Sequence, residues 1–230
     1  MFARAKMGTA KGDIYWNNVS LLLHLDSDFS DQTGKCTVTN TNGTISSTQS
    51  KFGGASANFN KTAYVVATNN TGLQFGTGDF TIEGWIYLST KESTGNVLFS
   101  KRANPAGAKG LVLYIDPTTG YVEVRAGDSN TVDSWNVVIS SGSVLSLTTW
   151  HHLAVCRSSN NYYAFVDGNQ IGSTVNWSGT LDSDSYNLWI GYSDGTASGL
   201  NGYIDEFRVT KGVARYTSNF TPSGSAFPNS

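Results

Sequence analysis

Hydrophobic and polar residues alternate in short segments along most of this chain, and polar turns separate the segments. Phe80–Leu88 is the clearest case: alternate positions carry Phe, Ile, Gly, Ile and Leu, and the positions between them carry Thr, Glu, Trp and Tyr. A period of two is typical of β-strands that bury one face. By this criterion we predict the strands Val19–Leu25, Cys36–Asn40, Thr44–Ser46, Ala55–Phe59, Tyr64–Val66, Phe80–Leu88, Val97–Ser100, Leu111–Ile115, Tyr121–Arg125, Trp135–Ile139, His151–Arg157, Tyr162–Val166, Asn169–Ser173, Leu188–Tyr192 and Gly202–Thr210.

The segments between these strands carry turn residues. Asp167-Gly168 is a strong hairpin signal between two strands, and residues 212–216 are expected to form one helical turn. Short strands at regular spacing predict an all-β fold, an antiparallel β-sandwich or jelly roll. We expect an irregular N-terminal arm over residues 1–18, one sandwich domain over residues 19–222 and a C-terminal tail over residues 223–230.

Charge and hydropathy exclude several classes of function. Charged residues make up 14% of the 230, the formal net charge is −2, and Lys and Arg form no run. We therefore expect no nucleic-acid partner. No apolar stretch is long enough to span a membrane, and the first eight residues lack the apolar core of a secretory signal. We expect either a signal removed upstream or synthesis in a cytosol with release by lysis, as for a virus particle.

The last predicted strand contains a carboxylate that needs a partner. By alternation, Asp205 shares a face with Phe207 and Val209. An ionised carboxylate on a core face is costly unless it is paired or bound to a cation. The candidate partners are backbone N–H groups, Arg215, His24 and a calcium ion.

The two cysteines, Cys36 and Cys156, lie far apart in strand-like segments. A disulfide scaffold would be rich in cysteine. We therefore expect two buried free thiols.

Six segments, in this order along the chain, together resemble the laminin-G-like branch of the concanavalin A-like lectin/glucanase superfamily. They are Leu21–Asp26, Lys51–Ala55, Gly78–Trp85, Trp150–Val155, Phe165–Gly168 and Gly202–Arg208. The resemblance covers roughly residues 19–222 and implies a lectin-like jelly roll. The C-terminal residues 212–222 are similar to versions found in bacteriophage tail, fibre and decoration proteins, which suggests a virion.

The resemblance also implies a place for calcium. In relatives of this fold a structural ion commonly lies on the convex side, held by an acid of the last strand, a carbonyl near the first strand and a glycine carbonyl. The matching positions here are Asp205, the Asp26 region, and Gly53 or Gly54. Such a mixture of carboxylate and carbonyl oxygens suits Ca²⁺. The acidic turn that contains Asp26, Asp28 and Asp31 is a rival cluster, although acidic turns are usually solvated.

Because the superfamily includes β-glucanases, catalysis needs a test. Glycoside hydrolysis generally requires two carboxyl groups that flank the scissile bond. The retaining glucanases of this fold carry three alternating acids on one strand, and no glutamate of this chain has such neighbours. The glutamates are Glu83, Glu92, Glu123 and Glu206. We expect Glu83 to be a strand-face carboxylate paired with Arg208, and the protein not to be an enzyme.

The three histidines do not indicate a catalytic or zinc site. The histidines are His24, His151 and His152, and a zinc or nucleophile-base site would need a cysteine or an acid as their partner at close spacing. Adjacent strand residues point to opposite faces, so we expect one of the pair His151-His152 to be a core hydrogen-bonding group and the other to be exposed.

Sugar binding would use aromatic platforms beside polar loop residues, because the apolar face of a sugar ring stacks on an aromatic ring. The candidates are Trp135, Trp177, Tyr186 and Tyr192; Trp16, in the arm, also lies in or beside a polar loop. Trp177, between Asn and Ser, is the best single candidate, although aromatics at loop bases often pin the loop instead. Three tryptophans lie within strands and are expected to pack in the core or on a sheet face: Trp85, Trp150 and Trp189.

Together these observations favour a non-enzymatic lectin-like module on a virion, such as a phage tail fibre or capsid decoration protein, that adheres to host-surface glycans. We expect virion proteins as partners, with the arm as the anchor. One alternative is a purely structural virion protein without a glycan site; another is a glycoside hydrolase or lyase. Modules of this kind are often homo-oligomers in virions, but no coiled-coil heptad here specifies an oligomer.

Overall fold

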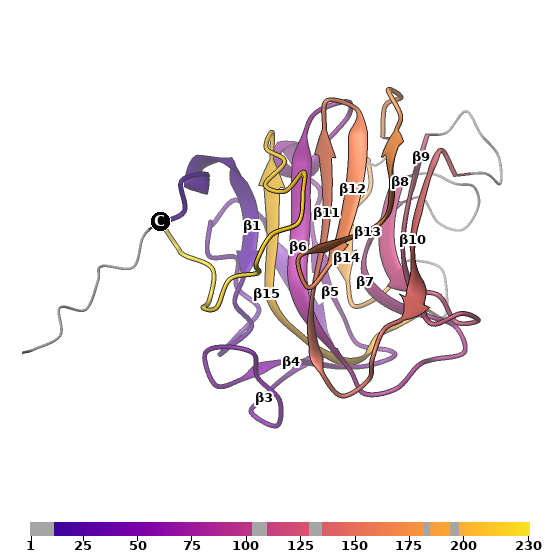
Figure 1. The fold of residues 1–230 in the computed structure, drawn as a ribbon. Helices are drawn as coiled ribbons and strands as arrows, with labels where there is room; N and C mark the ends of the chain where they lie inside the picture. Colours follow the sequence, from indigo (N-terminus) through magenta and orange to yellow (C-terminus); the bar gives the residue numbers. More distant parts are fainter. Residues whose placement is uncertain (1–11, 103–109, 129–134, 182–184, 194–197) are drawn as a thin grey trace, which may run out of the picture.

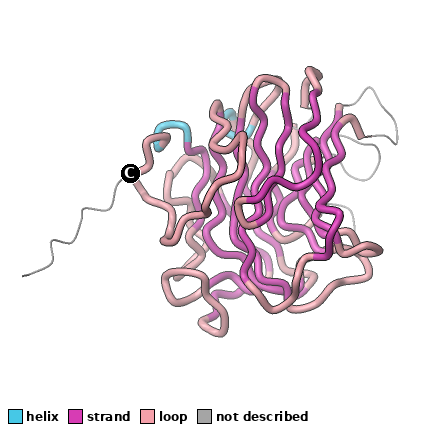
Figure 2. The backbone as a smooth tube through the Cα atoms, in the orientation of Figure 1, coloured by secondary structure: helices cyan, strands magenta, loops and turns pink. Residues whose placement is uncertain are grey.

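Two antiparallel sheets pack face to face in the computed structural model, which describes residues 12–102, 110–128, 135–181, 185–193 and 198–230. Figure 1 shows the two layers, and Figure 2 shows that strands dominate. Within the described residues, helix is confined to two short 3-10 segments, η1 (Trp16–Asn18) and η2 (Thr71–Leu73).

The first sheet, called sheet A, has the strand order β13-β12-β11-β6-β15-β4-β3, and β1 also pairs with β15. Its strands are β1 (Val19–Leu23), β3 (Thr44–Ser46), β4 (Ser56–Asn60), β6 (Phe80–Leu88), β11 (Trp150–Ser158), β12 (Asn161–Val166), β13 (Asn169–Asn176) and β15 (Asn201–Lys211).

The second sheet, called sheet B, has the strand order β10-β9-β8-β7-β14-β5-β2. Its strands are β2 (Val38–Thr41), β5 (Tyr64–Ala67), β7 (Asn96–Lys101), β8 (Gly110–Ile115), β9 (Tyr121–Gly127), β10 (Val137–Val144) and β14 (Leu188–Ile190). Neighbours in the sheet are often distant in sequence, as for β7 and β14.

The core lies between the sheets and follows the alternation of the strands. In β6 the apolar set of alternate positions, from Phe80 to Leu88, joins the core cluster, as the pattern predicts. Each predicted strand has a counterpart in the structure, and the all-β sandwich is confirmed. The helical turn expected at residues 212–216 is wrong: the segment is irregular, and the N–H of Arg215 donates to Thr81 Oγ1 of sheet A instead of to a carbonyl of a helical turn.

The hairpin at Asp167-Gly168 is confirmed. Both residues have positive φ, 51° and 77°, as a tight turn of the I′ type requires. The turn is also a docking point, because the N–H of Phe220 donates to the carbonyl of Gly168 at 2.9 Å. A Cβ at Gly168 would overlap the carbonyl oxygen of Phe220.

A β-bulge in β15 corrects the expected placement of Asp205. The register with β6 shifts between Asp205 and Arg208, and Glu206 has a φ of 56°. The bulge inserts one residue, so Phe207 and Val209 join the core together with Ile204. Asp205 therefore lies on the outer face of sheet A and not on the core face.

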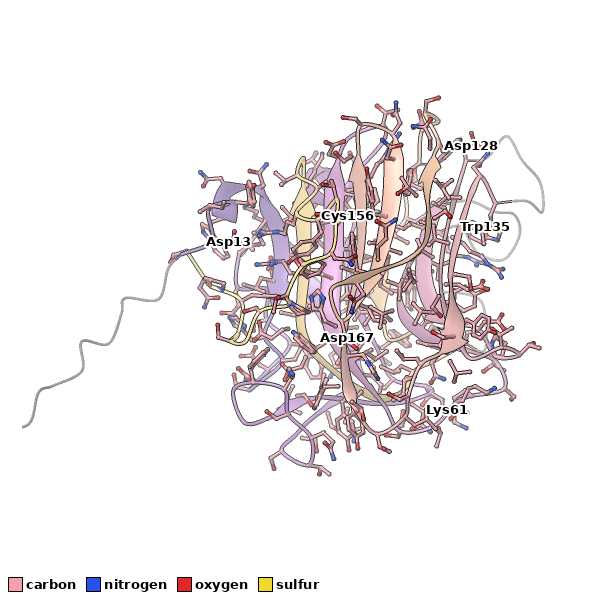
Figure 3. The ribbon with its side chains drawn as sticks, in the orientation of Figure 1. Asp13, Lys61, Asp128, Trp135, Cys156 and Asp167 are labelled. Atoms are coloured by element: carbon pink, nitrogen blue, oxygen red, sulfur yellow. The ribbon has the colours of Figure 1, made fainter. Side chains whose placement is uncertain are left out.

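The ends of the described chain meet on the outer face of sheet A. The N–H of Asp13 donates to the terminal carbonyl of Ser230 at 2.5 Å, and Figure 3 shows Asp13 beside the C-terminus. Phe227 is buried against Val19 and Leu22. The strands begin at Val19, but most of the predicted arm lies outside the described residues, so the proposed division of the chain stays a prediction.

Both cysteines are free thiols, as expected. Cys156 is fully buried in sheet A, whereas Cys36 is only half-buried. Burial raises the pKa of the Cys156 thiol to about 12, although a hydrogen bond with Thr81 opposes this shift. Cys156 is therefore an inert thiol at neutral pH.

Candidate functional site

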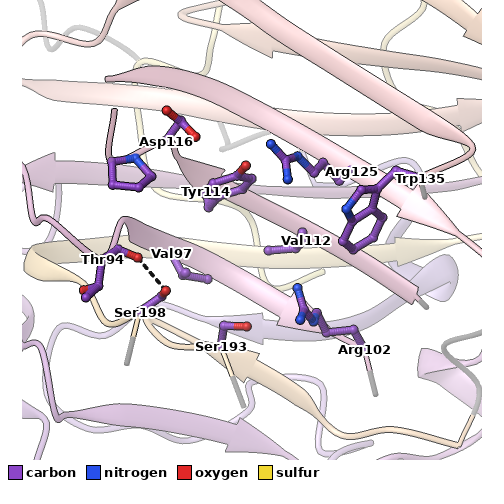
Figure 4. A pocket seen from close by; sticks show the side chains of 11 residues that line it. Thr94, Val97, Arg102, Val112, Tyr114, Asp116, Arg125, Trp135, Ser193 and Ser198 are labelled. Carbon is purple, nitrogen blue, oxygen red and sulfur yellow. Dashed lines mark hydrogen bonds between the residues drawn. The ribbon is translucent and has the colours of Figure 1, made fainter. Parts of the chain in front are cut away.

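A cavity of about 280 Å³ opens on the outer face of sheet B. Its floor comes from β7, β8 and β9, where Val97, Val112, Tyr114 and Arg125 line it. Figure 4 shows the cavity from close by, with Trp135 at one side. The cavity thus joins apolar, aromatic and charged side chains, which is the composition of a small-molecule site.

Strand alternation explains why these side chains meet. In β8 the core takes Leu111, Leu113 and Ile115, so Val112 and Tyr114 face outward. The neighbouring strand β9 behaves the same way, and Val112 is directly opposite Arg125 in the ladder. Residues opposite each other in a ladder share a face.

A hydrogen-bonded group fixes one wall of the cavity. The hydroxyl of Tyr114 donates to Glu123 Oε2 at 2.8 Å, and Arg125 donates to the same oxygen from Nε at 2.9 Å and from Nη2 at 2.7 Å. The Arg125 guanidinium also lies 5.1 Å from the centre of the Tyr114 ring. Burial and the hydrogen bond to Glu123 raise the pKa of the Tyr114 phenol, so Tyr114 stays a neutral ring and donor.

Arg102 faces this group from the end of β7. Its guanidinium lies 5.7 Å from the Trp135 ring centre, within cation–π range. Arg102 Nε is buried and has no hydrogen-bond partner, and no carboxylate of the described residues pairs with Arg102. Burial and the nearby charge of Arg125 lower the pKa of Arg102. The cavity therefore holds a partly desolvated cation that forms no ion pair with the residues that the structure describes.

The Asp116 carboxyl group, beside the cavity, is unsuited to proton donation. Backbone N–H groups of Thr119 and Thr118 lower the pKa of Asp116, which lines the cavity, although its slight burial opposes them. Glu123 accepts three hydrogen bonds, two of them from Arg125. A glycosidase needs a general acid whose pKa is raised, and Asp116 does not meet that requirement. Glu123 Oε2 is occupied as the acceptor for Tyr114 and Arg125.

The predicted sugar-binding residues lie in different places. Trp135 lines the cavity. Tyr192 is half-exposed beside β14, with its ring 6.2 Å from that of Trp189, and the backbone carbonyl of Tyr186 accepts a hydrogen bond from Lys101. Trp177 does not line the cavity; it packs on Tyr162 in the core at 6.0 Å. The structure therefore does not bring the four residues together, and their sugar contacts stay predictions.

Alternation alone could have found two of the residues that the sequence analysis missed. Tyr114 and Arg125 are polar or aromatic positions between core positions of clear strands. Trp189 was expected in the core or on a sheet face, and it lies on the outer face of sheet B, half-exposed. The order of the strands could not be read from the sequence, so their convergence was not predictable.

A second cluster surrounds Asp205 on sheet A. Asp205 Oδ2 accepts the N–H groups of Lys51 at 2.8 Å and Phe52 at 3.1 Å. Backbone N–H groups, one of the expected partners, therefore satisfy one oxygen. Arg215, another candidate partner of Asp205, binds Asp13 instead, at 2.6 Å. The candidate pairing of Asp205 with His24 is also wrong.

His24 pairs instead with Glu206, at 2.7 Å. The other Asp205 oxygen, Oδ1, is buried without a partner, and so is Asp26 Oδ1. Burial raises the pKa of Asp205 to about 7, and the negative charges of Glu206 and Asp26 add to the rise. The backbone N–H groups of Phe52 and Lys51 act in the opposite direction and lower this pKa.

The expected calcium ligands fit a cation in part. Asp26 lies directly against Gly53, where a Cβ would collide with the carboxylate. Two carboxylate oxygens here, Asp26 Oδ1 and Asp205 Oδ1, are buried without a hydrogen-bond partner. Among the described residues no group of three or more His, Cys, Asp or Glu side chains forms a metal cluster. A calcium ion at this place would therefore draw further oxygens from carbonyls of the Gly53-Gly54 turn and from water.

A buried ion network occupies the outer face of sheet A. Glu83 is fully buried and binds Arg208 at 2.7 Å, as expected, while Tyr216 donates to it at 2.9 Å. Burial alone would raise the pKa of Glu83, but the charges of Arg208 and His152 hold it well below its usual range. Glu83 is therefore a fixed anion beneath the chain termini.

The histidine prediction is wrong in one respect. His151 and His152 are both buried, and each faces an acid brought close by the fold, Asp167 at 2.7 Å and Glu83 at 3.1 Å. Ser146 Oγ lies 2.7 Å from the other ring nitrogen of His151. These contacts form a chain of serine, histidine and aspartate.

The Ser146–His151–Asp167 arrangement lacks the buried aspartate of a hydrolase triad. The Asp167 side chain is 42% exposed, whereas the aspartate of such a triad is buried and stabilises the imidazolium. Asp167 Oδ1 also accepts the N–H of His152 at 2.8 Å. The arrangement therefore ties the loop at Ser146 to the β12–β13 hairpin.

Several solved structures share this fold. The binding domain of Paraclostridial Mosquitocidal Protein 1 has a TM-score of 0.70 and 14% identity, covering 88% of this chain and 50% of that one. A second structure is Domain 4 of AbnA, a GH43 extracellular arabinanase from Geobacillus stearothermophilus, in complex with arabinotriose. It has a TM-score of 0.65 and 18% identity, covering 86% of this chain and 94% of that one. The binding domain of botulinum neurotoxin serotype D/C has a TM-score of 0.63 and 14% identity, covering 85% of this chain and 49% of that one.

This chain thus spans about half the length of two of these three structures. No curated protein matches it. The family described as the concanavalin A-like lectin/glucanases superfamily, in its laminin-G form, matches residues 58–215, which is more than half of the chain. The fold and this match agree with the motifs in the sequence, and the chain belongs to the concanavalin A-like lectin/glucanases superfamily.

Proposed function

We propose that this domain binds glycans without cleaving them, and that its site is the cavity on the outer face of sheet B. The observation that carries the proposal is the pairing of aromatic rings with fixed polar groups: Trp135 and Tyr114 offer ring faces, and Arg102 and Arg125 offer donors. Sugar recognition uses this combination of stacking and directed hydrogen bonds. The arabinotriose complex of Domain 4 of AbnA is a precedent on a similar fold.

Glycan-array binding tests this proposal, and two tryptophan variants localise the site. Trp135→Ala should weaken binding roughly tenfold, because a stacking face is lost. Trp177→Ala is the matched control, since Trp177 packs on Tyr162 and does not line the cavity. Loss of binding only in Trp177→Ala would move the site to that loop. Absence of binding to any glycan would favour a purely structural role.

Labelling of Ser146 tests whether the protein cleaves bonds. A fluorophosphonate probe labels serines that a histidine activates, and we expect it to leave Ser146 unlabelled because Asp167 is solvated. Labelling that disappears in Ser146→Ala would favour the second candidate, a hydrolase. Hydrolysis of a polysaccharide panel that disappears in Glu83→Gln would likewise revive a glycosidase or lyase.

We place the module on a virion, made in the host cytoplasm, with virion proteins as partners and host-surface glycans as ligands. The similarity of residues 212–222 to phage tail and decoration proteins supports this setting. Within the described residues, no helix has the length and apolarity needed to cross a bilayer. Mass spectrometry of purified particles tests the proposal, and full incorporation after deletion of residues 1–11 would contradict an anchoring arm.

We also propose a structural Ca²⁺ held by Asp205, Asp26 and carbonyls of the Gly53-Gly54 turn. The two buried carboxylate oxygens without partners support it. When bound, the ion would neutralise these carboxylates and tie the loop at residues 47–54 to β15. A melting temperature that a chelator leaves unchanged would count against the ion.

A further inference from the structure

A second group of aromatic rings lies on the same face of sheet B as the cavity. Tyr64 of β5 lies 4.9 Å from Trp189 of β14 and 5.5 Å from Tyr192, measured between ring centres. All three side chains are half-exposed. We call these three residues the aromatic cluster. Three adjoining rings that solvent can reach form a stacking platform.

The pairing register places the aromatic cluster and the cavity in line. Trp189 is opposite Ser100, Ser100 is opposite Val112, and Val112 is opposite Arg125. Residues in such a row share a face, and three strand spacings separate Trp189 from Arg125, roughly 14 Å. Ser193, next to Tyr192 in sequence, lines the cavity. A ligand longer than one sugar ring can therefore contact both places.

The cavity end of this row favours a negative charge. Arg102 is a partly desolvated cation with a buried Nε that has no partner, and its charge adds to that of Arg125 across the cavity. Arg125 already has Glu123 as its counter-ion at 2.7 Å, whereas Arg102 has none among the described residues. A planar carboxylate matches the donor geometry of a guanidinium.

We propose that the ligand is an acidic oligosaccharide that lies across sheet B, with a sugar carboxylate on Arg102 in the cavity and following sugar rings on the aromatic cluster. This proposal rests on the proposed function and narrows it to a ligand class. Sulfated glycans share the anionic chemistry, and single-stranded nucleic acid combines anions with stacking bases, so both enter the test as separate arms.

The experiment compares the affinity of the protein for acidic oligosaccharides (galacturonan, alginate, hyaluronan and polysialic acid) with its affinity for their neutral methyl esters. Each ligand is tested as a disaccharide and as a longer chain. We expect the free acids to bind roughly tenfold more tightly than the esters, and longer chains to bind more tightly than disaccharides. Arg102→Gln should lower the affinity for the free acids to that for the esters, because the cation that distinguishes them is lost. Lys211→Gln, a cation on sheet A, is the matched control and should change neither.

Variants of the aromatic cluster test the extended path. Tyr192→Ala and Trp189→Phe should weaken long chains about three- to tenfold and leave disaccharides unchanged, with melting curves to verify folding. Equal affinity for acids and esters would overturn the inference while the glycan-binding function survives. Tighter binding of sulfated chains or of an oligonucleotide would overturn the carboxylate assignment. No binding to any glycan would end both proposals.

Discussion

Glu83 is a fully buried carboxylate with Arg208 as its ion-pair partner. It accepts hydrogen bonds from Arg208 at 2.7 and 3.0 Å, and Tyr216 and His152 complete its partners. An ion buried in this way is stable only when its charges balance, because desolvation is expensive. The network therefore specifies how the termini pack more than it adds net stability.

Replacement of Glu83 by glutamine tests this account. The shape is kept, but Arg208 loses the carboxylate, and we expect a loss of about 3–5 kcal/mol in the free energy of unfolding, measured by urea denaturation. Lys61→Gln is the control: it breaks the pair with Glu92, in which Lys61 is 53% exposed, and should cost less than about 1 kcal/mol. Similar losses in the two variants would show that the network is not buried in solution.

Asp205 predicts a pH dependence of a definite sign. Its folded pKa of about 7 lies above the ordinary value of 3.8. A raised pKa contributes stability that is fully present below about 3.8 and is lost as pH rises through 7. In chelator, the wild type should lose stability relative to Asp205→Asn between about pH 4 and pH 7, by a few kcal/mol, as measured by urea denaturation at each pH.

Calcium should reverse this trend, because a bound cation favours the ionised carboxylate. Added Ca²⁺ at pH 7.5 should raise the melting temperature of the wild type and leave Asp205→Asn unchanged. Equal responses of the two proteins to calcium would exclude Asp205 as a ligand, and a flat pH difference would show that the carboxylate is solvated.

At the scale of elements, periodicity predicted the strands but not their partners. The alternation in Phe80–Leu88 identified its core face correctly because each apolar side chain gains from burial. The bulge at Glu206 has no such signal, since one extra residue with positive φ changes the face of Asp205 without changing the composition. The cavity was missed for a related reason: β7 pairs with β14, which lies about ninety residues later in the chain, and no local pattern encodes that neighbour.

The β12–β13 hairpin gives a prediction at this scale. Gly168→Ala adds a Cβ at a φ of 77° and against the carbonyl of Phe220, so the turn must shift or release the C-terminal segment. We expect a loss of about 2–4 kcal/mol, by urea denaturation. Gly34→Ala has a similar φ of 67° in open space and should lose only about 1 kcal/mol. Equal losses would mean that strain in φ, and not the contact with Phe220, limits the turn.

At the scale of the whole molecule, the two outer faces of the sandwich differ. Sheet A is covered: Asp13 binds Arg208 and Arg215, and Tyr216 stacks on Phe220 at 3.5 Å over Phe165. Sheet B carries the cavity and the aromatic cluster. The two ends of the described chain thus cover one face, and the proposed ligand site lies on the other.

This division predicts that stability and binding can be separated. Deletion of residues 223–230 removes Phe227, whose N–H donates to Glu206 at 2.8 Å and whose ring lies 3.8 Å from the Arg208 guanidinium. We expect a loss of about 2–4 kcal/mol in unfolding free energy, by urea denaturation. The Kd for the best glycan of the array should stay unchanged, because the cavity lies on the opposite sheet.

Arg125→Gln should behave in the opposite way. Its ion pair with Glu123 is partly exposed, with Arg125 at 33%, so its loss should cost less than about 1 kcal/mol of stability, while the Kd rises roughly tenfold as a donor leaves the cavity. The crossed result, weaker binding in the truncated chain at a temperature where it is folded and normal binding in Arg125→Gln, would place the ligand on sheet A. In that case the termini, and not the cavity, would form the recognition surface.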